Sequence, residues 1–115
     1  MGAYPRVEAT IRQLVDWLVV ADYRAVEVFT GGERMSAADL QQVIENYGRK
    51  LISIPSCGLE KLDVIEIVGS RSRSWSVRVD LWTEEDGRSD LTLECTMREG
   101  AGEVLDTDID NIHVA

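Results

Sequence analysis

The sequence has no long apolar run, only one histidine and only two cysteines. A membrane span needs about 20 apolar residues, and the best candidate, residues 14–21, is interrupted by Asp16. One histidine, His113, excludes histidine-rich metal sites and Cys–His zinc sites. There is also no nucleophile elbow, glycine-rich phosphate loop or HExxH motif. These absences favour a non-enzymatic protein that needs no membrane, metal or cofactor.

The first residues also lack the basic region, apolar stretch and cleavage site of a signal peptide. The myristoylation pattern that begins at Gly2 fails because Arg6 stands where a serine or threonine is required. We therefore expect a cytoplasmic, reducing location, in which Cys57 and Cys95 remain free thiols. Cys95 alternates with apolar neighbours and should be buried, whereas Cys57 belongs to a loop.

The net charge of −9 is concentrated in the last quarter of the chain. Residues 1–83 hold 10 basic and 11 acidic side chains, a net of −1, whereas residues 84–115 hold 2 basic and 10 acidic ones, a net of −8. This distribution argues against nucleic acid and anionic membranes as partners, since both require a basic face. It permits a basic protein partner or a cation. The alternative is a solvated acidic surface that only keeps the protein soluble.

Local signals in the first half predict three amphipathic helices. Pro5 suits a first helical position, and Asp22 can cap a short second helix. Ser36 starts the third helix with Asp39 in a capping box, and Gly48 ends it. The apolar stripe of the first helix consists of Val7, Ile11, Leu14, Val15 and Leu18.

After the third helix the apolar period changes from 3.6 to 2. Residues 74–82 and 90–97 alternate apolar and polar side chains, which is typical of an antiparallel sheet covered on one face. Residues 51–54 and 62–68 are further strand candidates, and the facing of residues 62–68 stays open. A last strand runs from about residue 104 to 109, with a bulge near Asp110.

A chain of 115 residues has room for one core, so residues 1–115 should form a single domain. We predict an α+β two-layer sandwich, with three N-terminal helices packed on one face of a curved antiparallel sheet of about four strands.

The register of the two alternating strands follows from placing apolar residues opposite one another. A loop at residues 85–87 and an outer pair of Arg78 with Glu94 result from this register. The predicted inner pairs are Trp75 with Met97, Val77 with Cys95, Val79 with Leu93, and Leu81 with Leu91.

Three stretches, residues 46–49 (NYGR), 75–96 (WSVRVDLWTEEDGRSDLTLECT) and 109–114 (IDNIHV), together resemble a family of small bacterial domains of unknown function. The order of the elements also resembles the cystatin-like and nuclear-transport-factor-like α+β group. That second resemblance implies a curved sheet that wraps helices around a cone-shaped pocket, and it transfers no catalytic residues.

The run of residues 106–111 (DTDIDN) is similar to the opening of a calcium-binding loop. Such a loop requires glycine at its sixth position, where Asn111 stands here, so an EF-hand is excluded. On an extended strand, Asp106, Asp108 and Asp110 would share one face. They are then either a weak cation site or a charged row that protects a sheet edge.

Trp82 lies on the predicted outer face of the sheet among charged side chains. A tryptophan there belongs either to a protein interface or to a contact with its own chain. Our leading hypothesis is a non-enzymatic protein-binding module, of immunity or adaptor type, that uses this acidic face to bind a basic protein or a second copy. The candidate binding residues are Trp82, Arg78, Arg88, Asp90 and Glu94.

The alternative hypothesis is a small-molecule-binding pocket, or a weak enzyme of the nuclear-transport-factor-like type, between helices and sheet. Its candidate residues are Tyr47, Trp75 and His113. A cavity lined by Tyr47 and Trp75 would favour this pocket, whereas a filled core favours the binding module.

Overall fold

The helices begin and end where the local signals place them. The computed structural model describes residues 4–69, 71–100 and 102–114. Helix α1 (Pro5–Val19) begins at its proline, and α2 (Tyr23–Thr30) is capped by Asp22, which accepts a hydrogen bond from the Ala25 amide at 3.2 Å. Helix α3 (Ala37–Tyr47) carries the predicted capping box of Ser36 and Asp39. None of these helices has the length and apolar character to cross a bilayer.

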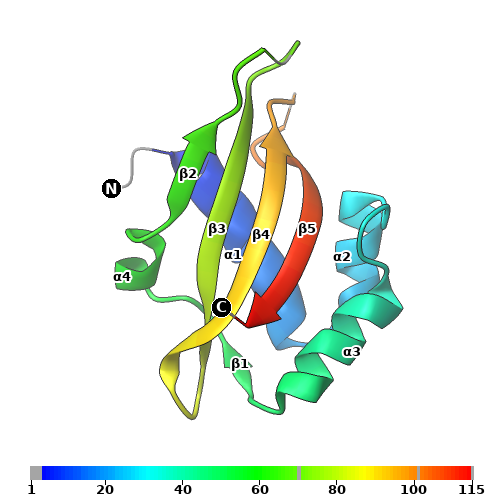
Figure 1. Cartoon of the computed structure of the whole chain (residues 1–115), viewed down its shortest axis with the longest axis vertical. Helices are drawn as coiled ribbons and strands as arrows, with labels where there is room; N and C mark the ends of the chain where they lie inside the picture. Colours follow the sequence, from blue (N-terminus) through cyan, green and yellow to red (C-terminus); the bar gives the residue numbers. More distant parts are fainter. Residues whose placement is uncertain (1–3, 70, 101, 115) are drawn as a thin grey trace.

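The strands of the described residues form one antiparallel sheet, shown in Figure 1. Strands β3, β4 and β5 are neighbours in that order, while β1 and β2 both pair with the other edge of β3. One of the five strands is only two residues long. Their bounds are β1 (Leu51–Ile52), β2 (Asp63–Glu66), β3 (Ser74–Thr83), β4 (Gly87–Arg98) and β5 (Asp106–Val114), and the one-turn helix α4 (Ser56–Leu59) lies between β1 and β2.

The core lies between α1 and the sheet. In Figure 1, α1 runs behind the strands, while α2 and α3 lie beside β5. The predicted apolar stripe of α1 is buried throughout, and so are the alternating apolar residues of β3 and β4. The predicted α+β architecture, with helices on one face of an antiparallel sheet, is therefore confirmed.

Two side chains of α1 hold the connection between β4 and β5 against the helix. The Arg6 guanidinium donates hydrogen bonds to the carbonyl oxygens of Gly100 at 2.9 Å and Gly102 at 2.6 Å. The buried Thr10 hydroxyl accepts a hydrogen bond from the Leu105 amide at 2.9 Å. The contact with Thr10 satisfies the buried Leu105 amide, which would otherwise lose water without gaining a partner.

The predicted register of β3 and β4 is confirmed over most of their length. Trp75 faces Met97, Arg78 faces Glu94 and Val79 faces Leu93. The predicted pair of Leu81 with Leu91 is wrong, because the register shifts between Asp80↔Thr92 and Trp82↔Arg88. The hairpin turn is also displaced by one residue from the prediction and comprises residues 84–86.

Strand β4 holds three residues, 89–91, opposite the single residue Leu81. The two extra residues are accommodated because the Ser89 side chain replaces ladder hydrogen bonds. Its hydroxyl donates to the Leu81 carbonyl at 2.6 Å and accepts from the Leu91 amide at 3.2 Å. A β-bulge of this kind changes the direction in which a neighbouring side chain points.

The bulge predicted near Asp110 is present in β5, where the register shifts between Glu94↔Asn111 and Cys95↔Ile109. The two cysteines are free, with Cys95 buried on β4 and Cys57 exposed on α4. Residue 57 thus belongs to a one-turn helix rather than to the loop we predicted.

Candidate functional site

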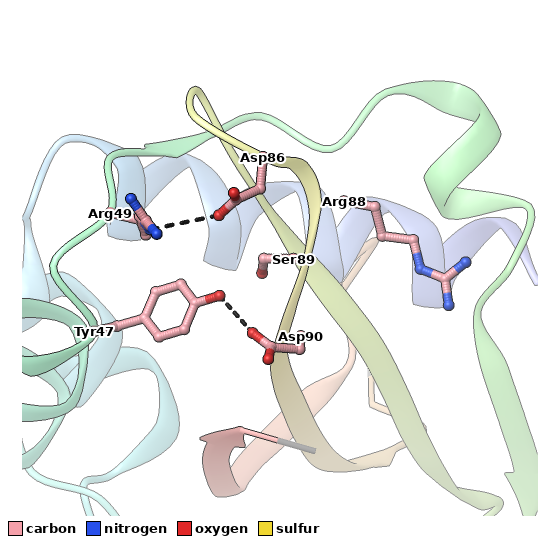
Figure 2. Close-up of a pocket in the computed structure, with 6 residues that line it drawn as sticks. All are labelled: Tyr47, Arg49, Asp86, Arg88, Ser89 and Asp90. Atoms are coloured by element: carbon pink, nitrogen blue, oxygen red, sulfur yellow. Dashed lines mark hydrogen bonds and ion pairs between the residues drawn. The ribbon is translucent and has the colours of Figure 1, made fainter.

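A polar pocket of about 500 Å³ lies where the end of α3 meets the hairpin of β3 and β4. Figure 2 shows it, with Tyr47 reaching from α3 toward β4. The pocket brings together Tyr47 and Asp90, which we had assigned to two different hypotheses. Arg88 also lines it, but its side chain points away from Tyr47 and Asp90 in Figure 2. The lining residues are Tyr47, Arg49, Asp86, Arg88, Ser89 and Asp90.

The bulge in β4 directs Asp90 into this pocket. A regular ladder would continue the outer row of β4, with Asp90 beside Thr92 and Glu94. Instead, the Asp90 carboxylate accepts a hydrogen bond of 2.6 Å from the Tyr47 hydroxyl. Ser89 stays buried, and its hydroxyl is already engaged with the backbone. It is therefore not positioned to act as an activated nucleophile.

The Tyr47–Asp90 hydrogen bond determines the chemistry that this pocket offers. The bond to the carboxylate, and to a smaller degree burial, raises the pKa of the Tyr47 phenol above its ordinary value. A phenol with a raised pKa stays protonated near neutral pH, so Tyr47 is a hydrogen-bond donor rather than a general base. The geometry favours the recognition of a polar group over proton transfer.

The acidic turn of the hairpin holds the segment that follows α3. The Glu85 carboxylate accepts a hydrogen bond from the Lys50 amide at 3.0 Å, and the Glu84 amide donates to the Lys50 carbonyl at 2.9 Å. Asp86 forms an ion pair with Arg49 at 3.5 Å. Part of the negative charge of residues 84–115 thus has a structural use at the wall of the pocket.

An apolar cleft of about 350 Å³ lies on the other side of Tyr47. Its lining residues are Val43, Asn46, Tyr47, Leu91, His113 and Val114. Tyr47 and His113 therefore line the same cleft, as the pocket hypothesis requires. Trp75 does not join them, because it pairs with Met97, seven residues along β4 from Asp90. That separation is about 23 Å at roughly 3.3 Å per residue.

The outer face of the sheet carries ion pairs in place of a uniformly acidic surface. Arg78 lies 3.0 Å from Glu94, whose other carboxylate oxygen lies 2.9 Å from His113 Nε2. Arg88 contacts Asp80 at 2.8 Å. A third pair joins Arg98 and Asp108 at 3.0 Å. In Figure 1 helices α1, α2 and α3 leave the near face of the sheet, opposite to α1, uncovered, and α4 packs against Trp82 at the hairpin end of that face.

Trp82 packs against its own chain and is half-buried. Helix α4 passes so close that a Cβ added to Gly58 would lie 2.7 Å from Trp82 Nε1. On the hairpin side, a Cβ added to Gly87 would lie 3.7 Å from the indole ring. Of the two alternatives for this residue, the intramolecular contact is the one observed. Part of the Trp82 side chain stays exposed, so its role as a binding residue stays a prediction.

The carboxylates of residues 106–110 are held apart by different partners. Asp108 pairs with Arg98, and Asp110 accepts a hydrogen bond of 2.7 Å from Thr96 and lies 3.3 Å from Arg34. Within residues 4–69, 71–100 and 102–114, no group of three or more acidic, histidine or cysteine side chains is arranged to hold a metal ion. The alternative of a charged row at the sheet edge fits these contacts.

Sequence reasoning did not select Arg49, Asp86 or Ser89 as site residues. Arg49 and Asp86 are 37 positions apart, and only the contact between the hairpin and the end of α3 brings them together. The one local signal was the NYGR stretch of residues 46–49, which contains Tyr47 and Arg49 and carried part of the family resemblance.

Comparisons with known proteins agree with that resemblance at the level of the family. The comparison with curated proteins gave no match, and neither did the comparison with solved structures. The comparison with protein families matched residues 15–115, which include both the pocket and the whole sheet. The chain therefore belongs to the family of the domain of unknown function DUF7668.

Proposed function

We propose that this chain is a cytoplasmic, non-enzymatic protein-binding module that engages a basic partner through the outer face of its sheet. The observation that carries the proposal is the excess of carboxylates on an uncovered sheet face. Among the described residues, three arginines on the strands, at positions 78, 88 and 98, face six carboxylates there, and Arg34 and Lys61 add two cations at the margins of this face. Those carboxylates belong to Asp63, Asp80, Glu94, Asp106, Asp108 and Asp110.

The ion pairs hold charged side chains of this face in fixed positions, while the acids that have no ion-pair partner give the face a net negative charge. Paired residues such as Arg78 and Glu94 are held in place by each other, which limits the side-chain entropy lost on binding. Unmatched acids such as Asp106 attract a basic surface over a distance of about 10 Å at 0.1 M salt. Complementary charge of this kind mainly accelerates association. An immunity-type or adaptor protein would use both properties.

The proposal can be tested with two variants that add the same positive charge on different faces. Asp106 and Asn111 are exposed on the outer face of β5, and Asp16 and Gln42 are exposed on α1 and α3. Asp106→Lys with Asn111→Lys is the test variant, and Asp16→Lys with Gln42→Lys is its control. Each pair changes the net charge by +3.

The partner is first captured on the immobilised chain from a lysate of the cells that naturally make this protein. It is then purified, and its association rate with each variant is measured. We expect the outer-face variant to associate several-fold more slowly at 50 mM salt and to approach the wild-type rate at 500 mM salt. The helix-face control should associate at nearly the wild-type rate. Equal slowing in both variants would reject the outer face as the binding surface.

The pocket beside Tyr47 supports a second candidate, the binding of a small polar molecule. The specific observation is the bulge that turns Asp90 away from the sheet face and into the pocket. Bulges recur beside functional sites because they redirect a side chain. A fragment screen by NMR would detect binding as shifts at Ser89 and Asp90 that weaken in Tyr47→Phe. Shifts that persist unchanged in this variant would exclude the pocket.

A further inference from the structure

The edge of β2 that does not face β3 carries exposed apolar side chains. β2 pairs with β3 on one side, and in Figure 1 it forms the left margin of the sheet. Three exposed apolar side chains lie on it or directly after it: Ile65 is 61% exposed, Ile67 38% and Val68 95%. Natural edge strands usually prevent pairing by being short or by carrying charged residues, proline or a bulge. β2 is only four residues long and carries Asp63 and Glu66, so two of these protections are present. Residues 63–68 contain neither lysine nor proline, and their pairing with β3 has no register shift.

The backbone groups on this edge can be assigned from the ladder. The Ile67 amide donates to the Ser74 carbonyl at 2.8 Å, so these two residues form a hydrogen-bonded pair. Hydrogen-bonded and non-hydrogen-bonded pairs alternate along an antiparallel ladder. Ile65 therefore also directs its N–H and C=O toward β3, while Val64 and Glu66 direct theirs toward the free edge.

We propose that the β2 edge is a self-association surface, on which β2 of one copy pairs antiparallel with β2 of a second copy. This inference does not rest on the proposed binding of a basic protein, because it uses the edge of the sheet and not its outer face. The two sheets would join into one continuous sheet, with five strands from each copy.

A symmetric antiparallel pairing that uses most of β2 is centred on residue 64, 65 or 66. In a symmetric dimer whose two outer faces lie on the same side, the two-fold axis passes between the two β2 strands. The residue at the centre of the pairing is then opposite the same residue of the second copy. Centring on Glu66 would place two carboxylates opposite each other, which is unfavourable. Centring on Val64 would place Asp63 opposite Ile65, and no exposed isoleucine would then face its own copy.

Centring on Ile65 satisfies the outward backbone groups and the apolar side chains together. Val64 and Glu66 of one copy then form hydrogen-bonded pairs with Glu66 and Val64 of the other. Ile65 faces Ile65 of the second copy in a non-hydrogen-bonded pair, where Cα atoms approach to about 4.5 Å. Ile67 of each copy faces Asp63 of the other and lies diagonally beside this pair, so the apolar contact on the outer face is made mainly by the two Ile65 side chains.

Charge complementarity supports a second copy as the occupant. Antiparallel pairing brings the segment before one β2 next to the turn after the other. Residues 60–63 carry two acids and one lysine, a net of −1, whereas residues 66–73 carry two arginines and one glutamate, a net of +1. The symmetric pairing therefore places opposite net charges together at both ends. The strand is short, and stable interfaces bury at least about 1,000 Å², so we expect a weak dimer.

The first test is cysteine crosslinking, which traps a weak dimer and reports its register. Ile65→Cys is introduced with Cys57→Ser, because Cys57 is the exposed thiol and Cys95 is buried. The matched controls are Ile67→Cys and Val28→Cys in the same background, since Val28 is 73% exposed on α2. In the proposed register, the two Ile65 positions lie within the Cα distance that a disulfide accepts.

With copper phenanthroline as oxidant, we expect the residue 65 variant to form a covalent dimer at least 10-fold faster than either control. Sedimentation velocity of the uncrosslinked wild-type chain should show a rise from 12.9 kDa toward twice that mass between about 10 and 500 µM. Ile65→Lys, an exposed substitution whose fold is checked by circular dichroism, should remain monomeric over that range.

Equal crosslinking rates at residues 65 and 28 would overturn the proposal, and so would a wild-type chain that stays monomeric at 500 µM. The two proposals can fail separately. Loss of partner binding in the Asp106→Lys and Asn111→Lys variant leaves the β2 edge intact, and Ile65→Lys leaves the acids of the outer face in place.

Discussion

The two faces of the β3–β4 ribbon differ in what holds their side chains. On the inner face, Val77, Leu93 and Cys95 are completely buried against the helices. On the outer face, residues of the same strands form exposed ion pairs such as Arg78 with Glu94. Burial of apolar area is the main stabilising contribution in folding, whereas exposed ion pairs contribute little. The inner face thus specifies the fold, and the outer face remains free to carry recognition.

This contrast has one exception at the hairpin end of the ribbon. Trp82 points to the outer face, yet α4 and Gly87 enclose its indole ring. Close by, Tyr47 reaches from α3 to Asp90. The outer face therefore has an open region over the middle of the strands and a packed region at the hairpin. We therefore expect substitutions in the packed region to change stability more than substitutions in the open region.

The largest effect is expected at the centre of the inner face. Leu93→Ala should lower the free energy of unfolding by about 2–5 kcal/mol, because it removes a fully buried side chain and leaves a cavity. The control is Ser76→Ala on the outer face, where a change of no more than about 0.5 kcal/mol is expected. Urea denaturation measures both values. Similar losses in the two variants would contradict the division between the faces.

Gly58→Ala should destabilise the packed end by about 1–3 kcal/mol through overpacking. The added Cβ would lie 2.7 Å from both Trp82 Nε1 and Ile54 Cγ2. In a Trp82→Ala background part of this strain disappears, so the cost of the alanine should be smaller there. A double-mutant cycle by thermal denaturation tests this coupling. Independent effects of the two substitutions would show that Trp82 does not pack against α4.

Tyr47→Phe should cost about 1 kcal/mol at neutral pH, because it removes the hydrogen bond to Asp90. The raised pKa of Tyr47 means that folding favours the neutral phenol. The stability that the Tyr47 phenol contributes is therefore complete below its pKa in the unfolded chain, about 10. This stability is lost as the pH rises through the higher pKa of the folded protein.

Ultraviolet titration of the phenols can follow this group directly. Burial, together with the charge of Glu45, also raises the pKa of Tyr23, so the wild type should show two late-titrating phenols. Tyr47→Phe should remove one of them. An unchanged late component would mean that Tyr47 does not bond to Asp90 in solution.

The smallest effect is expected in the open region of the outer face. A double-mutant cycle with Arg78→Ala and Glu94→Ala should give a coupling of about 0.2–1 kcal/mol. The pair is exposed, so 1 M salt should reduce the coupling further. A coupling above 2 kcal/mol would show that the pair is much less solvated than its exposure indicates.

The helices and the facing of the strands could be predicted because their signals are local. Pro5, Asp22 and the capping box of Ser36 and Asp39 act within one helical turn. The alternation of residues 74–82 and 90–97 reports directly which side chains leave water. The bulge at Asp110 was also visible, because a single extra residue changes the apolar spacing from Ile109 to Ile112.

The bulge at Ser89 and Asp90 could not be predicted from the sequence, because it does not change the alternation of apolar and polar residues. Two extra residues are an even number, so Leu81 and Leu91 both stay on the inner face whether or not the bulge exists. The apolar pattern is the same in either register. Only the hydrogen bonds of the Ser89 hydroxyl and the Tyr47 phenol distinguish the two arrangements.

The sequence by itself determined the α+β architecture, the inner face of the ribbon and the excess negative charge of its last quarter. These properties depend on local propensity, on period and on composition. Tertiary structure alone decided that Tyr47 meets Asp90, 43 positions away, and that α4 covers Trp82. It also placed β1 and β2 on the same edge of β3, and no strand of the described residues pairs with the other side of β2. Contacts between distant segments depend on how whole elements pack, and no periodicity within one segment records that packing.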